Sequence, residues 1–164
     1  MVALIALATV VAAGCSKRGS SALAASGAPV SIEPGAAVGK VRLGMTEPEV
    51  ITALGTPDRN SGSALRYRQY GIEIVLNGER GVKSIICGDE NGPDSPMVKA
   101  FSGHTKEGIG LGSTRAEVVK AHGEPTKTEQ RSQHEVLWYR PQGLVFMIGA
   151  GKVDYIQVNL RDPK

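Results

Sequence analysis

Polar and apolar residues along the chain follow two spacings. Around Val50 and around Val118, apolar residues recur three and four positions apart, which predicts two short helices. Elsewhere they alternate with polar residues or run together, as they do in strands. These strand-like runs cover residues 64–70, 72–76, 82–87, 136–140, 144–148 and 152–159, and turns rich in Gly, Asn and Pro separate them. The order helix, strand, strand, strand therefore occurs twice.

The two helical stretches are copies of one sequence. Residues 40–57 and 108–125 are identical at eight of 18 positions, and in each copy a Thr precedes a Glu by three residues. Thr46 with Glu49, and Thr114 with Glu117, have the spacing of a capping box at a helix N-terminus. A Gly and then a Pro end each copy, as at helix C-termini. The repeated sequence thus predicts a helix of about nine residues, too short to be stable unless it packs against other elements.

These elements predict an α+β fold of two tandem α-β-β-β repeats. In each repeat a short helix would pack on a three-stranded antiparallel sheet. The first repeat would span residues 32–87 and the second residues 104–164. Residues 88–103 would link them, because Gly, Pro and acidic residues gather there without hydrophobic periodicity. A unit of about 55 residues is marginally stable alone, so we expect the two repeats to pack together.

The N-terminus has the features of an export signal. Residues 2–13 are apolar or small and uncharged, a run too short to cross a bilayer but typical of a signal peptide. Small residues then lead to Cys15, and this sequence resembles the lipobox of bacterial lipoproteins. It predicts a lipoprotein signal peptide over residues 1–14, a lipid on Cys15 and a flexible tether over residues 15–31. An ordinary secretory signal, which would leave Cys15 free, is the alternative.

Composition narrows the classes of partner and of chemistry. The net charge is +3 and no dense Lys/Arg cluster occurs, so we expect no nucleic-acid partner. Aromatic residues make up only 4% of the chain, so the core must consist mainly of aliphatic side chains. Apart from Cys15 there is one cysteine, Cys87. It ends an apolar run and is expected to be a small buried residue.

The sequence shows no catalytic or metal-binding pattern. The three histidines, His104, His122 and His134, lack the spacing of metal ligands. The glycines of residues 108–113 do not fit a phosphate-binding loop, and the acidic residues of 89–94 do not fit a calcium-binding loop. We therefore predict a protein that is not an enzyme and that has no cofactor and no metal. A hydrolase with a site between the two repeats is the competing hypothesis.

Binding of another protein is the function that the residues favour. Tyr, Trp and Arg are the residue types that most often anchor protein interfaces. They occur together on the first strand of each predicted sheet, which makes Tyr67, Arg68, Trp138, Tyr139 and Arg140 candidate partner-binding residues. Strand alternation puts Trp138 and Tyr139 on opposite faces, so we expect one in the core and the other at the surface.

The repeated helix with its capping box, glycine and proline, followed by three strands, resembles the SmpA/OmlA (BamE-type) outer-membrane lipoprotein domain. It is also similar to the tandem-repeat architecture of the β-lactamase-inhibitor-protein superfamily. The first resemblance implies a non-enzymatic accessory of outer-membrane assembly, and the second implies an inhibitor.

These observations predict a lipid-anchored envelope protein, most simply in the outer membrane and facing the periplasm. It would act as a protein-binding or scaffold module in outer-membrane assembly or maintenance, with an envelope protein as its partner. The alternative is a secreted protein that inhibits or binds an extracellular enzyme.

Overall fold

Most strands of the protein belong to one continuous antiparallel sheet of eight strands. The computed structural model describes residues 30–88 and 100–162. Across the large sheet the order is β4 (Arg59–Asn60), β5 (Ala64–Tyr67), β6 (Ile72–Leu76), β7 (Val82–Gly88), β12 (Lys152–Asn159), β11 (Leu144–Gly149), β10 (His134–Tyr139) and β9 (Lys127–Arg131). Three short 3-10 turns, at Arg68–Tyr70, Gly78–Arg80 and Arg140–Gln142, lie between its strands.

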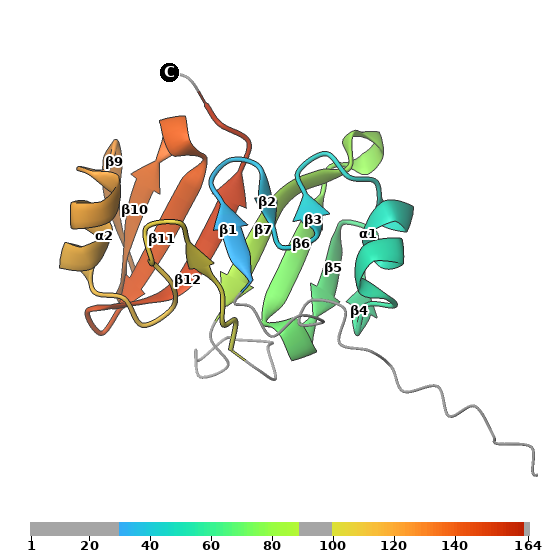
Figure 1. Ribbon diagram of the computed structural model, residues 1–164, viewed down its shortest axis with the longest axis horizontal. Helices are drawn as coiled ribbons and strands as arrows, with labels where there is room; N and C mark the ends of the chain where they lie inside the picture. Colours follow the sequence, from blue (N-terminus) through green and yellow to red (C-terminus); the bar gives the residue numbers. More distant parts are fainter. Residues whose placement is uncertain (1–29, 89–99, 163–164) are drawn as a thin grey trace, which may run out of the picture.

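A second, smaller sheet and two helices lie on one side of the large sheet. The small sheet has the order β3 (Val41–Arg42), β2 (Ala37–Val38), β1 (Ser31–Glu33) and β8 (His104–Thr105), with β1 and β8 parallel. In Figure 1 it lies in front of the middle of the large sheet, between α1 (Glu47–Leu54) and α2 (Arg115–His122). Together the small sheet and the helices cover one face of the large sheet.

The predicted fold of two tandem α-β-β-β repeats, each with its own three-stranded sheet, is wrong. The strands of the two predicted repeats join, because β7 pairs with β12 through five register pairs, from Ser84↔Asn159 to Gly88↔Tyr155. Two separate sheets would leave the outer backbone groups of both strands without partners, and the pairing satisfies them. The sequence pattern also missed β1, β2, β3, β4 and β8, because strands of two or three residues are too short to show a period. It missed β9 as well, because the five residues of that strand are all polar and show no alternation.

The helix ends follow the predicted capping chemistry. The Glu49 carboxylate accepts hydrogen bonds from the backbone N–H and the hydroxyl of Thr46, at 2.8 Å each. Glu117 does the same for Thr114, at 2.7 Å and 3.0 Å. Hydrogen bonding to these exposed carboxylates lowers the pKa of Glu49 and of Glu117. Each helix has eight residues and is followed by a glycine with positive φ.

One hydrophobic core lies between the large sheet and the layer that covers it. It draws on both halves of the chain, from Ile32, Val38 and Val50 to Phe146, Ile156 and Val158. Phe101, within the predicted linker of residues 88–103, is also buried in this core, whereas residues 89–99 lie outside the described part of the chain. The core, the helices and the small sheet thus lie on one face of the large sheet.

Candidate protein-binding surface

The face of the large sheet that points away from the helices carries mixed polar and apolar side chains. Strand alternation sets this face, because the neighbouring residue on each strand belongs to the core. The strand registers place one row of side chains across all eight strands: Arg59, Arg66, Glu73, Ile86, Gln157, Val145, Trp138 and Lys127. We call this the open face. In the part of this row that comes from the first half of the chain, Arg66 and Glu73 form an ion pair, with Arg66 Nη2 2.6 Å from Glu73 Oε2.

Trp138 is the largest side chain of that row and is only partly buried. The guanidinium carbons of Arg131 and Arg140 lie 5.6 Å and 5.9 Å from the centre of its ring, within the range of cation–π contacts. Its indole nitrogen Nε1 is buried and has no hydrogen-bond partner among the described residues. An unsatisfied buried donor typically costs about 1–3 kcal/mol.

A groove of about 460 Å³ opens beside Trp138 at the end of the β7–β12 pair. We call it the Trp138 groove. It is lined by Trp138, Gln157, Asn159 and Leu160 from the second half of the chain, and by Gly44, Asn77, Arg80, Val82 and Lys83 from the first half. Leu160 has 64% of its surface exposed, and among the described residues it is the one large hydrophobic residue that is exposed. The groove therefore exists only because the two halves share one sheet.

A smaller depression of about 220 Å³ adjoins the groove. It shares Trp138, Asn159 and Leu160 with the groove and adds Arg140, Val145 and Asp162. Val145 is almost fully buried, at 4% exposure, so the floor of the depression is apolar. The combined surface has an apolar middle and a polar rim, which is the usual anatomy of a protein interface.

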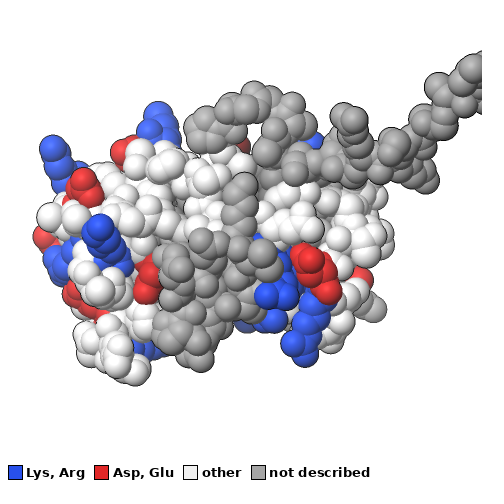
Figure 2. Space-filling model, turned by 90° about the horizontal axis from the view of Figure 1, so that it is seen from below, with Lys and Arg blue, Asp and Glu red and all other residues white. Residues whose placement is uncertain are grey.

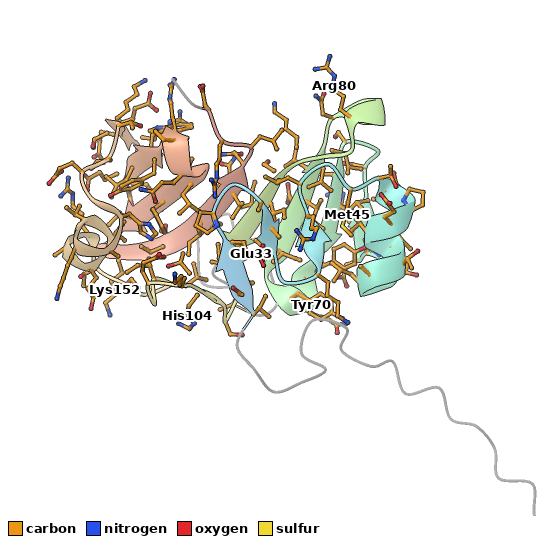
Figure 3. All side chains as sticks on the ribbon, turned by 45° about the horizontal axis from the view of Figure 1, so that its top comes forward. Glu33, Met45, Tyr70, Arg80, His104 and Lys152 are labelled. Carbon is orange, nitrogen blue, oxygen red and sulfur yellow. The ribbon has the colours of Figure 1, made fainter. Side chains whose placement is uncertain are left out.

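The charge around the groove is positive. Arg80 and Lys83 line it, and the lining side chains that the structure describes include no carboxylate. Figure 3 shows Arg80 projecting from the end of the molecule, away from the sheet. On the side seen in Figure 2, several described basic and acidic side chains lie next to one another.

A charged cluster on β9 borders Trp138. Glu129 is hydrogen-bonded to Lys127 and Arg131, and these two bonds lower the pKa of Glu129 to about 2. The carboxylate is therefore ionised at neutral pH and faces two cations. The cluster keeps one net positive charge and holds Arg131 where it also contacts the Trp138 ring.

The structure brings together two of the five predicted partner-binding residues, Trp138 and Arg140. Tyr67 and Tyr139 are in the core, at 2% and 1% exposure, and their hydroxyls donate to Gly55 O and Gly123 O at 2.9 Å. Arg68 is exposed in the first 3-10 turn, where its backbone N–H donates to Asp58 Oδ2 at 2.7 Å. As strand alternation predicts, Trp138 and Tyr139 lie on opposite faces; the structure shows that Tyr139 is the one in the core.

Sequence reasoning missed Arg80, Lys83, Gln157, Asn159 and Leu160. The one available signal was Leu160, an apolar residue just after a predicted strand. The others look like ordinary surface residues of turns and strands, and only the β7–β12 pairing makes them neighbours of Trp138.

The groups that could do chemistry lie elsewhere. His134 Nε2 is 2.9 Å from Asp154 Oδ2, and no hydroxyl or thiol within the described ranges hydrogen-bonds to His134. Burial raises the pKa of the Cys87 thiol far above its usual range, which keeps it protonated and unreactive. No group of three or more His, Cys, Asp or Glu residues in the described part of the chain could hold a metal ion.

The predicted lipidation site, Cys15, lies outside the described residues, as does all of the predicted signal peptide. Within residues 30–88 and 100–162, no helix is long and apolar enough to cross a membrane.

Comparisons with known proteins give two structural likenesses. A DUF4309 family protein from Bacillus subtilis subsp. subtilis str. 168 is 15% identical, with a TM-score of 0.49; the match covers 71% of this chain and 78% of that one. An extracellular protein containing a SCP domain, from Bacillus anthracis str. Ames, is 10% identical, with a TM-score of 0.42; the match covers 72% of this chain and 44% of that one. No family model and no curated protein matches the chain. The resemblance to the BamE-type domain therefore stays a prediction, and function has to be argued from the surface itself.

Proposed function

We propose that the protein is a non-enzymatic binding protein, held at the cell envelope by a lipid on Cys15, and that it binds a partner protein in the Trp138 groove. The observation that carries the proposal is that the partly exposed Trp138 and the exposed Leu160 line one concave surface. The lipid anchor is supported by the sequence from residue 1 to Cys15.

The residue types and shape of the groove fit protein recognition. Trp and Arg are the side chains whose truncation most often costs binding energy at interfaces, and they act best in sheltered pockets. A groove of about 460 Å³ has the size of a site for one or two side chains of a partner. The apolar middle supplies affinity and the polar rim of Asn77, Gln157 and Asn159 supplies hydrogen bonds.

Site-specific photo-crosslinking tests the groove. A photoreactive amino acid at Leu160, in the full-length protein in its own cell envelope, should capture one discrete protein that mass spectrometry can identify. The same probe at Ala116 is the matched control, because Ala116 is exposed on α2, on the other side of the sheet. The captured protein is then purified, and its affinity for the wild type and for Trp138→Ala is measured by calorimetry.

We expect Trp138→Ala to weaken that affinity by at least about 30-fold, which corresponds to about 2 kcal/mol, the threshold of an interface hot spot. Circular dichroism should show that the variant is folded, since Trp138 lies outside the core. Equal affinity of the wild type and the variant, or equal capture from Leu160 and Ala116, would refute the groove as the binding site.

The anchor is tested separately. Labelling with a radioactive fatty acid should mark the wild type and not Cys15→Ala. Absence of label on the wild type would favour the alternative of a secreted binding protein or inhibitor. The resemblance to the BamE-type domain directs the first search for partners to the proteins of outer-membrane assembly.

A further inference from the structure

We infer that the segment bound in the Trp138 groove is an extended acidic stretch of the partner with an apolar side chain next to its carboxylates. This inference rests on the proposed function and names the chemistry of the ligand. Three features of the groove support it: the charges that line it, its apolar side chains, and the cation–π contacts of the Trp138 ring.

Basic side chains line the groove and the depression beside it. Arg80 and Lys83 stand on the first-half wall of the groove and Arg140 on the rim of the adjoining depression, where Asp162 is the single carboxylate. Basic side chains that line one groove attract a negatively charged partner and repel a positive one. Arg66, on the same open face, is by contrast already paired with Glu73. Among the described side chains, the groove and the adjoining depression thus carry three cations and one carboxylate.

The apolar part lies between these cations. Trp138 and Leu160, both from the second half of the chain, supply the accessible apolar surface of the groove, whereas Val82 of the first half is almost fully buried. A purely acidic ligand would leave this surface in contact with water. One Leu, Ile or Phe side chain of the partner would bury it, and carboxylates one residue away would reach the basic rim, because side chains in an extended segment alternate.

A single-stranded nucleic acid also combines negative charge with flat rings, but the groove suits it less well. Binding of that kind depends on bases stacking on a free aromatic face. The Trp138 ring is already within cation–π distance of Arg131 and of Arg140. No other aromatic side chain lines the groove among the described residues, so it lacks a second ring on which a neighbouring base could stack.

Fluorescein-labelled peptides test the inference with the full-length protein. The probe is a nine-residue peptide that alternates Leu and Asp, and the control probe has Lys at every Asp position. Because Trp138 is the one tryptophan in the chain, its emission reports the groove directly, beside the anisotropy of the peptide. We expect the Leu–Asp peptide to bind and shift the emission, and to bind at least tenfold more weakly in 500 mM than in 50 mM salt.

Two variants locate the binding. Arg80→Ala with Lys83→Ala should weaken binding of the Leu–Asp peptide at least tenfold, and Leu160→Asp at least as much. Lys40→Ala with Lys106→Ala removes the same charge from two exposed lysines on the small-sheet side and should leave the affinity within twofold. If both double variants lose affinity equally, or if the Leu–Lys peptide binds as well as the Leu–Asp peptide, the inference is wrong.

Two further outcomes also overturn it. Tighter binding of an oligothymidylate of equal charge would assign the groove to nucleic acid. Capture of a partner through Leu160, with no binding of the Leu–Asp peptide, would leave the proposed function standing and reject only the acidic ligand.

Discussion

One tyrosine hydroxyl group connects the C-terminal end of each helix to the large sheet by a hydrogen bond. The Tyr67 hydroxyl donates to Gly55 O, and the Tyr139 hydroxyl donates to Gly123 O, both at 2.9 Å. Each glycine follows the last residue of a helix, where backbone carbonyls lack partners within the helix. The tyrosines that sequence reasoning assigned to partner binding thus have a structural task, and burial is the reason.

Tyr67 should make stability depend on pH in the alkaline range. Burial raises the pKa of Tyr67 to about 12, whereas an unfolded tyrosine has a pKa of about 10. Below pH 10 both states are protonated; above it the unfolded state loses the proton first, so the free energy of unfolding falls as the pH rises toward 12. Urea denaturation at pH 8 and pH 11 should show a smaller loss in Tyr67→Phe than in the wild type. Parallel losses in the two proteins would contradict this assignment.

At the scale of elements, the loop that enters each helix is tied to a strand of the large sheet. Gly44 N–H donates to Val82 O, and Val82 N–H donates to Met45 O, both at 2.8 Å. In the second half Gly112, Ser113 and Val153 make the same two bonds, at 2.7 Å and 2.8 Å. These paired bonds fix where each helix begins relative to the sheet.

Gly81 is the residue that this arrangement requires to be glycine. Its φ is +72°, and a Cβ there would lie 2.4 Å from Met45 O and 2.6 Å from Gly44 O, both backbone atoms. Gly62 has a similar φ of +79° but open space around it. We expect Gly62→Ala to lower the free energy of unfolding by about 1 kcal/mol through backbone strain alone. Gly81→Ala, which adds a clash, should lower it by about 2–4 kcal/mol. Equal losses in thermal or urea denaturation would show that the close approach does not matter.

At the scale of the whole molecule, the β7–β12 pairing makes one sheet and one core from two halves of the chain. Such a protein should unfold in a single transition, because disrupting either half exposes the core of the other. Two separately folded units would instead unfold in two steps.

A substitution in the first half and a probe in the second test this. Leu65 on β5 is fully buried, so Leu65→Ala should cost about 2–5 kcal/mol. Trp138 on β10 reports the second half by fluorescence. The urea midpoint seen by Trp138 emission should fall as far as the midpoint seen by circular dichroism. If the Trp138 midpoint stays where it is in the wild type, the two halves unfold independently.

The candidate site also depends on the tertiary structure of the whole molecule, because both halves of the chain line it. Trp138 and Arg140 could be recognised in the sequence by residue type, and alternation put Trp138 opposite Tyr139. Arg80 and Lys83 could not be recognised, because nothing local relates a turn of the first half to a strand end of the second. Only the long-range pairing brings them to the rim of the groove.

By itself the sequence determined the features that depend on neighbouring residues: the capped ends of α1 and α2, the main strands, and the opposite orientation of the two aromatics of β10. These follow from hydrogen bonds and side-chain spacing within a few residues. The tertiary structure alone decided that the strands form one eight-stranded sheet, that a four-stranded sheet covers its middle, and that a basic groove opens beside Trp138. Those features depend on which unpaired strand edges meet, and that is settled by burying one common core.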